Sequence, residues 1–365
     1  MKLEFIDLKR QYETYKNEID ARMQKVISNS AFIMGPEIKE LEEALGKFVG
    51  TKHAISCASG TDALFLVLLA YGVGEGDEII TTPFTFIATS EVIALLKAKP
   101  VFVDIDPQTY NIDPTKIEKA ITPRTKGIIA VNLFGQCADY DQINAVAKKH
   151  GLFVIEDAAQ SFGSEYQGRR SCSLSDVGCT SFFPAKPLGC FGDGGMIFLN
   201  DDSKADVIRS LRVHGMGKDK YDNVRIGMNG RMDTLQAAVV LAKFAHYPQE
   251  IKDRQSKAQY YTQGLSKAVK TPHLKDGYTS VWAQYSVCSP RRDDLQKFLK
   301  DAAIPTAIHY PMPLHLQKAF AHLGYKKGDF PVSEKLSQEI LALPMHPFLK
   351  NEEQDFIIGK IKEFS

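Results

Sequence analysis

Hydrophobic side chains near the start of the chain recur at helical spacing. Residues 10–28 place apolar side chains three and four positions apart, and Gly35-Pro36 opens a second stretch with the same period. Proline suits the first turn of a helix, where its missing N–H would have no partner inside the helix. The pattern therefore predicts two consecutive amphipathic helices.

Beyond residue 50, short apolar runs alternate with helical patterns. The runs predict buried strands at residues 54–57, 78–81, 100–103, 127–132, 152–155, 180–183 and 196–199. Helical spacing between them predicts helices at residues 61–71, 89–97, 140–150 and 203–213. This alternation indicates an α/β fold with a mostly parallel sheet that helices cover on both faces.

The pattern changes near residue 245. A long polar-faced helix over residues 249–268 leads into an α+β region, with strands at 282–288 and 306–310, a helix at 293–302 and two terminal helices. We therefore predict a large domain over residues 1–245 and a smaller C-terminal domain over residues 246–365.

Composition and charge exclude several function classes. The 365 residues carry a formal net charge of +1 without a basic or acidic block, so nothing indicates nucleic acid or an anionic membrane surface as a partner. The start of the chain lacks a signal-peptide core, and no apolar run approaches membrane-spanning length, which together predict a cytoplasmic protein.

Cysteine and histidine spacing argues against a metal site. The six cysteines form no Cys-x-x-Cys pair and no ligand spacing with a histidine, which indicates buried free thiols. His309 and His315 are separated by a proline-rich stretch and have no third ligand nearby. We expect no metal.

Lys186 has an unusual sequence environment. It lies between the apolar run at 180–183 and a glycine-rich turn, and the apolar strand at 152–155 ends in Glu156-Asp157. A buried carboxylate is costly unless paired, and a desolvated lysine close to such an acid is the arrangement that pyridoxal 5′-phosphate (PLP) chemistry needs. Each residue alone has an ordinary alternative: Asp157 pairs with an arginine or a helix N-terminus, and Lys186 is a surface lysine.

Two more segments bear on ligand binding. Gly60-Thr61 joins a predicted strand to a helix, where free N–H groups hold phosphate, although a plain helix cap has the same residues. Phe86 follows the strand at 78–81, where an aromatic ring either stacks on a cofactor or packs in the core. The glycines of 72–76 follow a helix and precede a strand, which excludes a Rossmann dehydrogenase.

Together these segments resemble the DegT/DnrJ/EryC/StrS family of PLP-dependent nucleotide-sugar aminotransferases. The resemblance spans essentially the whole chain and includes Phe5-Ile-Asp-Leu8, Gly35-Pro36-Glu37, Ser59-Gly-Thr-Asp-Ala-Leu64, Thr85-Phe-Ile-Ala-Thr89, Glu156-Asp-Ala-Ala-Gln160, residues 181–195, Asn229-Gly-Arg-Met-Asp233 and His309-Tyr-Pro. It implies the aspartate-aminotransferase (fold type I) architecture and a homodimer with shared active sites.

The resemblance also implies roles for individual residues. Lys186 would bind the cofactor aldehyde as a Schiff base and carry protons, Asp157 would pair with the pyridine nitrogen, and Gln160 would lie beside the ring. The other expected cofactor-binding residues are Phe86 on one ring face, Gly60, Thr61, Asp62 and Ser181 near the phosphate, and Asn229 from the partner subunit.

Within the family, three stretches are most similar to aminotransferases that act on a UDP-linked 2-acetamido-2-deoxy-3-oxo-glucuronic acid. They are Phe134-Gly-Gln-Cys-Ala-Asp139, residues 170–175 with 179–184, and residues 229–236. The resemblance implies L-glutamate as amino donor, a role in bacterial surface polysaccharide synthesis, and a sugar site lined by Ser30, Phe32, Ala185, Arg231, His309 and Tyr310.

Three alternative functions remain open at this point. One is the same chemistry on a 4-keto or 6-deoxy sugar. Another is a PLP-dependent dehydratase, in which histidine usually replaces the lysine that is intact here as Lys186. The third is a regulatory or sugar-binding protein without catalysis.

Overall fold

A seven-stranded sheet with the order β1-β9-β8-β5-β4-β2-β3 forms the centre of the chain. The structure is a computed structural model that describes residues 3–365. Strands β3, β2, β4, β5 and β8 are parallel, while β9 runs antiparallel to both β8 and β1. The strands are β1 His53–Cys57, β2 Glu78–Thr81, β3 Lys99–Phe102, β4 Thr125–Val131, β5 Phe153–Asp157, β8 Val177–Ser181 and β9 Gly195–Leu199.

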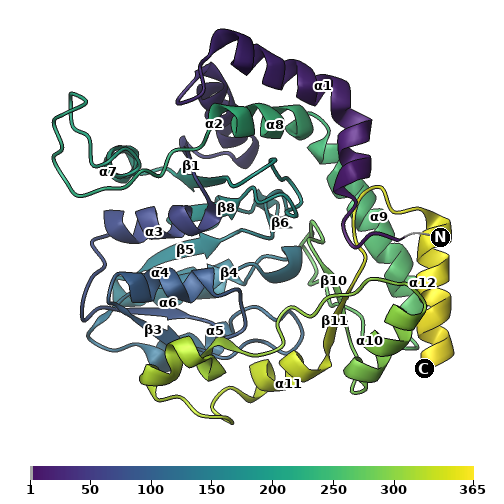
Figure 1. The fold of residues 1–365 in the computed structure, drawn as a ribbon. Coiled ribbons are helices and arrows are strands. Elements are labelled where there is room, and N and C mark those ends of the chain that lie inside the picture. Colours follow the sequence, from purple (N-terminus) through teal and green to yellow (C-terminus); the bar gives the residue numbers. More distant parts are fainter. Residues whose placement is uncertain (1–2) are drawn as a thin grey trace.

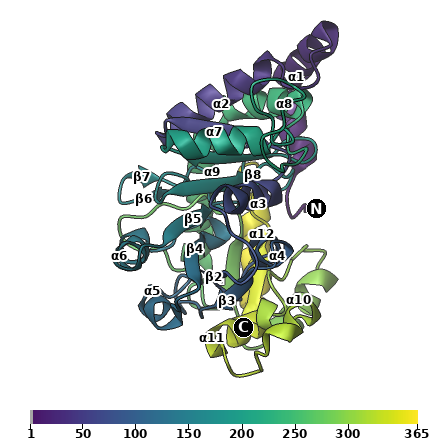
Figure 2. The same cartoon turned by 90° about the vertical axis from the view of Figure 1, so that its left-hand side faces the viewer.

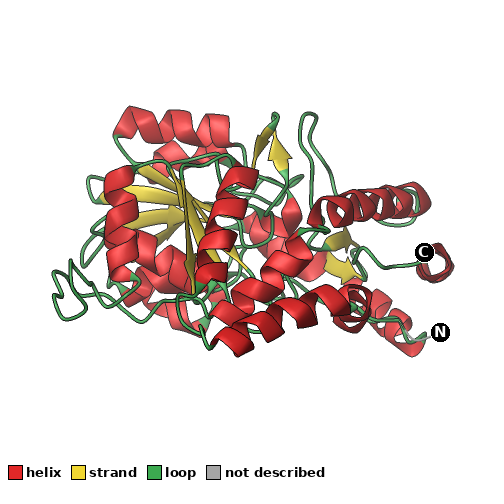
Figure 3. Cartoon of the chain, turned by 90° about the horizontal axis from the view of Figure 1, so that it is seen from above, coloured by secondary structure: helices red, strands yellow, loops and turns green. Residues whose placement is uncertain are grey.

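Side-chain alternation along the strands gives the sheet two apolar faces. In β5, Ile155 packs in the core with α3, α4 and α7, whereas Val154 packs on the opposite face with α5 and α6. Helices α2 and α8 extend this second layer over β1 and β9, and Figures 2 and 3 show the strands between the two helical layers. The predicted α/β fold with a mostly parallel, doubly covered sheet is confirmed. The helices are α2 Pro36–Val49, α3 Gly60–Ala70, α4 Ala88–Leu95, α5 Pro114–Ile117, α6 Tyr140–His150, α7 Asp202–Leu211 and α8 Thr234–Phe244.

The N-terminal helix α1 (Leu8–Asn29) lies across the second layer. It packs against α8 through a small core of Ile19, Val239 and Ala242 (Figure 1). Pro36 stands at the first turn of α2, as its position in the sequence predicts.

The C-terminal part has its own core beside the large sheet. Strands β10 and β11 pair antiparallel, and they pack with α9, α10 and α12 (Figure 1). The turn between α8 and α9 lies at the predicted domain boundary near residue 245. The remaining elements are β6 Glu165–Tyr166, β7 Arg169–Arg170, α9 Tyr247–Leu265, β10 Tyr285–Cys288, α10 Arg292–Asp301, α11 Pro331–Glu339, β11 Ile340–Leu343 and α12 Asn351–Phe364, with short 3-10 turns at Glu118–Ala120, Leu133–Gly135, Leu314–Leu316 and Lys318–Leu323.

The strand predicted at residues 306–310 is wrong. Only Ala307 makes a bridge, to Ala342, and β10 pairs with Ile340–Leu343 instead. Pro311 and Pro313 directly follow the predicted segment and lack the N–H donors that a strand needs for pairing. The true strand follows α11 without any turn residue, so its four apolar residues look like a continuation of the helix.

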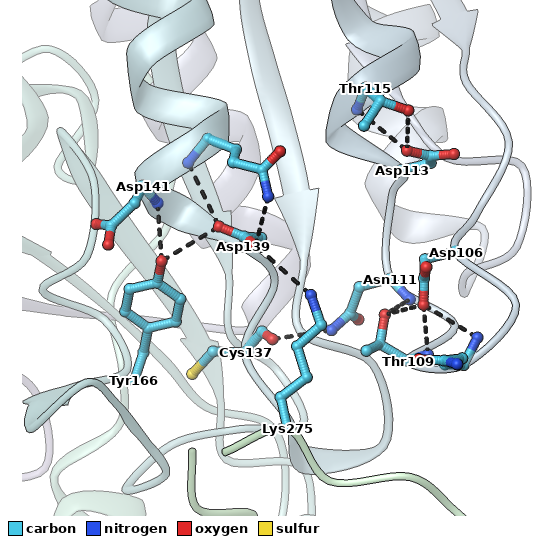
Figure 4. A network of polar contacts seen from close by, with 12 residues as sticks. Asp106, Thr109, Asn111, Asp113, Thr115, Cys137, Asp139, Asp141, Tyr166 and Lys275 are labelled. Atoms are coloured by element: carbon cyan, nitrogen blue, oxygen red, sulfur yellow. Dashed lines mark hydrogen bonds and ion pairs between the residues drawn. The ribbon is translucent and has the colours of Figure 1, made fainter. Parts of the chain in front are cut away.

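Long loops tie the C-terminal part to the large sheet. Tyr278 forms a bridge with Tyr166, and the Lys275 ammonium lies 3.5 Å from the Asp139 carboxylate, which also accepts a hydrogen bond from the Tyr166 hydroxyl at 3.2 Å (Figure 4). The two parts therefore share polar contacts along this edge.

Two further predictions concern the cysteines and membrane-spanning helices. All six cysteines are free and buried, as predicted. Within residues 3–365, no helix is both long and apolar enough to cross a membrane.

Asp104, just after β3, holds the start of α11. Its buried carboxylate accepts hydrogen bonds from the Val332 N–H (3.0 Å), the Ser333 N–H (3.0 Å) and the Ser333 hydroxyl (2.6 Å). A carboxylate at a helix N-terminus satisfies orphan donors and meets the positive end of the helix dipole.

We expect Asp104→Ala to lower the free energy of unfolding by about 2–3 kcal/mol, because it leaves buried N–H groups without an acceptor. The measurement is denaturant unfolding. Asp106→Ala is the matched control, since within residues 3–365 the Asp106 side chain accepts hydrogen bonds only in its own turn, from Gln108 and Thr109. Equal losses in the two variants would show that the contact between Asp104 and α11 contributes nothing.

Candidate functional site

The carboxyl ends of the parallel strands open into a cavity of about 680 Å³, a size typical of small-molecule sites. One wall consists of the N-terminus of α3, the segment after β2 and the ends of β4, β5 and β8. The opposite wall comes from the N-terminal segment and the C-terminal part, through Phe5, Ile6, Gln284, Ala307, His309 and Tyr310.

Lys186 and Asp157 both line this cavity. Lys186 lies in the loop between β8 and β9, and burial lowers its pKa, while the charge of Asp157 acts in the opposite direction. Among the residues described, no ammonium or guanidinium forms an ion pair with Asp157 within 4.0 Å. Lys186 and Asp157, which we expected to lie close together, therefore line one cavity and form no direct ion pair.

The Asp157 carboxylate is buried at the end of β5. The Thr89 hydroxyl donates to it at 2.8 Å, and the Ala159 N–H does so at 3.3 Å. Burial raises the pKa of Asp157, whereas these two hydrogen bonds and Lys186 lower it. The Thr85 hydroxyl lies 3.1 Å from that of Thr89 and extends the chain of hydroxyls.

Sequence reasoning assigned no role to Thr85 or Thr89. Two hydroxyls at i and i+4 in an apolar segment that follows a strand were the available signal. Their partner, however, is 68 positions further along the chain.

Gln160 and Tyr310 form one side of the site together with Phe86. The Gln160 amide donates to the Tyr310 hydroxyl at 3.2 Å, and its oxygen accepts from the Phe134 N–H at 2.8 Å. Because both ends of the amide are engaged, its orientation is fixed. The Phe86 ring is 56% exposed in the cavity wall and lies 6.4 Å from the ring of Tyr310. Phe86 therefore lines the cavity and does not pack in the core.

The N-terminus of α3 opens onto the same cavity. Gly60, Thr61 and Ser181 line it, and a Cβ atom at position 60 would lie 2.7 Å from the Ser181 Cβ, so the close approach of α3 to β8 requires glycine. Free N–H groups at a helix start attract anions. The Asp62 N–H is already bonded to the Ser59 hydroxyl at 3.0 Å, and Asp62 does not line the cavity.

Ala185 and His309 line the cavity, but four other expected residues do not. Ser30, Phe32, Asn229 and Arg231 do not line it; the Thr234 N–H donates to the Phe32 carbonyl at 3.0 Å, which joins the segments that follow Ser30 and Arg231. Burial and the charge of Lys186 lower the pKa of His309, whose Nδ1 atom has no hydrogen-bond partner among the described residues.

The lowered pKa of Lys186 has a consequence for stability. At pH values below that pKa the amine is charged in both the folded and the unfolded state, and the full desolvation cost of the buried charge lowers the free energy of unfolding. Between that pKa and 10.5 the folded state releases the proton that the unfolded state keeps, so stability rises with pH.

We expect Lys186→Met in cofactor-free protein to be more stable than the unaltered chain at pH 7, on the order of 1 kcal/mol, because it removes a poorly solvated charge. Denaturant unfolding at pH 7 and pH 10 would show the difference shrinking at the higher pH. Lys39→Met, at a side chain that is 82% exposed, is the control. A lower unfolding midpoint for Lys186→Met at pH 7 would contradict the idea.

Comparison with known proteins connects these features to one family. A sequence model of the DegT/DnrJ/EryC1/StrS aminotransferase family matches residues 13–362. A UDP-2-acetamido-2-deoxy-3-oxo-D-glucuronate aminotransferase of Pseudomonas aeruginosa is 54% identical over 348 residues, covering 95% of this chain and 96% of that protein. A pleiotropic regulatory protein of Geobacillus stearothermophilus is 48% identical and covers 100% and 99%. A family aminotransferase from Brucella abortus has a crystal structure with a TM-score of 0.97, 47% identity and 99% coverage of each chain.

The cavity fits the cofactor of this family. Solved relatives include forms with PLP and with pyridoxamine phosphate. Here a desolvated amine at Lys186, a buried carboxyl group at Asp157 and an anion site at the start of α3 face a single cavity, which matches the aldehyde, ring nitrogen and phosphate of PLP. The chain therefore belongs to the DegT/DnrJ/EryC1/StrS family of PLP-dependent aminotransferases.

Proposed function

We propose that this enzyme transfers the amino group of L-glutamate to the 3-keto carbon of a UDP-linked 2-acetamido-2-deoxy-3-oxo-glucuronic acid. The observation that carries the proposal is 54% identity, over 95% of the chain, with an aminotransferase named for that sugar. A second relative, 40% identical over 349 residues, is also named as a 3-aminotransferase of a UDP-linked 3-keto sugar.

The residues of the cavity account for the proton steps of such a reaction. PLP, when bound, supplies an electron sink for the carbon that loses a proton. The lowered pKa of Lys186 leaves more of its amine neutral, so this amine takes the proton and returns it. The Asp157 carboxylate, oriented by Thr89, holds a proton at the ring nitrogen.

Positioning of the cofactor falls to three kinds of contact. Gly60, Thr61 and Ser181 would hold the phosphate, Phe86 would lie against the ring, and the fixed amide of Gln160 sets the position of the Tyr310 hydroxyl. Asp62 and Asn229 stay predictions as further cofactor contacts.

We assign the sugar nucleotide to the mouth of the same cavity. His309 and Tyr310 line the cavity, and so does Ala185, whose methyl side chain leaves only main-chain groups for polar contact. Arg231 carries a planar, always-charged guanidinium that suits a uronate carboxylate or a diphosphate. A cytoplasmic role in bacterial surface polysaccharide synthesis is part of the proposal.

A homodimer with shared active sites would bring the outlying residues to the sugar. Ser30, Phe32, Asn229 and Arg231 do not line their own chain's cavity. Beside them, Phe32, Ile33 and Met34 expose 44%, 54% and 42% of their surface as one apolar run. Contiguous exposed apolar residues are typical of interfaces.

One observation favours a second candidate function. The relative that is 48% identical over the full chain is named as a regulatory protein. A regulatory role without catalysis would leave the conjunction of Lys186, Asp157 and Gln160 unused.

The function is tested with L-[¹⁵N]glutamate and the 3-keto sugar. We expect ¹⁵N bonded to C3 of the product by NMR, one 2-oxoglutarate released per product, and no multiple turnover in Lys186→Ala, because the proton carrier is lost. Lys39→Ala is the control. Nitrogen at C4 would favour a 4-keto substrate, a dehydrated product a dehydratase, and a protein that binds no PLP the regulatory role.

Shared active sites are tested with mixed dimers. We expect Lys186→Ala and Arg231→Ala each to be nearly inactive, and their co-expression to restore about a quarter of normal activity, because half of the dimers then contain one intact site. The readout is kcat per total protein. If Arg231 serves its own chain, mixing restores nothing.

A further inference from the structure

The loop that carries Lys186 is a closed lobe between two antiparallel strands. It leaves β8 after Ser181 and enters β9 at Gly195. The Phe182 N–H donates to the Gly194 carbonyl at 2.7 Å, and the Cys190 N–H donates to the Phe182 carbonyl at 2.7 Å, which closes the neck of the lobe. Inside the lobe, the Lys186 N–H donates to the Phe183 carbonyl at 2.8 Å.

Two side chains of α8 hold the residues on either side of Cys190, at the neck of this lobe. The Lys243 ammonium donates to the Gly189 carbonyl at 2.8 Å, and the Gln236 side-chain oxygen accepts from the Phe191 N–H at 2.8 Å. Residues 236 and 243 are seven positions apart and so face the same side of the helix. The ring of Phe191 lies 4.6 Å from the Lys243 ammonium.

Lys243 is an unusual residue for this position. It is only 2% exposed, and a buried ammonium is costly unless its donors are satisfied. Burial lowers its pKa to about 8, against the attraction of Glu250 and Cys190. An apolar residue of similar length would fill the space without this cost, so the hydrogen bond to the lobe needs an explanation beyond packing.

We propose that Lys243 is a positioning residue for Lys186. By fixing the Gly189 carbonyl, three residues from Lys186, it holds the lobe in the conformation that presents the Lys186 amine to the cavity, and Gln236 provides the second attachment. The proposal concerns cofactor binding and does not depend on which sugar or amino donor the enzyme uses.

The test compares Lys243→Met with a matched control. Lys204 makes the same two kinds of contact at a half-buried position outside the cavity lining: its ammonium donates to the Ala70 carbonyl at 3.0 Å and lies 4.6 Å from the ring of Tyr71. We expect Lys243→Met, but not Lys204→Met, to speed hydrogen exchange of the Lys186 and Phe191 amides in cofactor-free protein by about tenfold, because one hydrogen bond to a charged group is lost.

A second readout follows the cofactor itself. We expect PLP to dissociate from Lys243→Met about tenfold faster, and the pH midpoint of its visible absorption band to shift, with recovery toward normal in Lys243→Arg, which keeps a charged donor. Gln236→Leu should act in the same direction, which keeps the test valid if Lys243→Met does not fold.

The proposal is overturned if Lys243→Met lowers only the thermal midpoint while lobe exchange, PLP dissociation and the absorption midpoint stay within twofold of the unaltered protein. That result would assign Lys243 to packing alone. Neither readout requires sugar or glutamate, so a failure here is distinct from a failure of the proposed reaction.

Discussion

The site depends on keeping an amine and a carboxyl group in one poorly solvated cavity. Burial lowers the pKa of Lys186 and raises that of Asp157, so desolvation works toward the neutral form of both groups. Catalysis of this type requires the neutral amine of Lys186 but the ionised carboxylate of Asp157. The hydroxyl of Thr89 and the N–H of Ala159 provide that asymmetry, because they stabilise the carboxylate alone.

The architecture supplies these groups from different layers. Parallel strands β4, β5 and β8 end at one edge of the sheet, where α3 also begins, so the acid, the lysine loop and the anion site meet there. The second wall comes from the C-terminal part, which Asp104 and the contacts around Asp139 hold against the large sheet. The cavity-lining positions of His309 and Tyr310 therefore depend on that docking.

Much of the site follows from local sequence. Gly60, Asp157 and Lys186 lie shortly after predicted apolar strands, where their residue types stand out, and the resemblance to a known family then assigns their roles and adds Ser181. What local pattern misses are pairings across distance: Thr89 with Asp157 over 68 positions, and Gln160 with Tyr310 over 150. The strand that pairs with β10 was misplaced at 306–310, because the true strand β11 follows α11 with no turn residue between them.

Chemical modification of the six buried cysteines can report local unfolding of the regions that contain them. Burial raises the pKa of each thiol, so thiolate is scarce at neutral pH and direct attack by oxidants or alkylating reagents is slow. Cys179 lines the cavity, Cys190 belongs to the lysine lobe, and Cys288, at the end of β10, packs against residues of the large domain such as Phe84 and Val131. The rate at which each thiol is modified therefore reports how often the region around that cysteine unfolds locally.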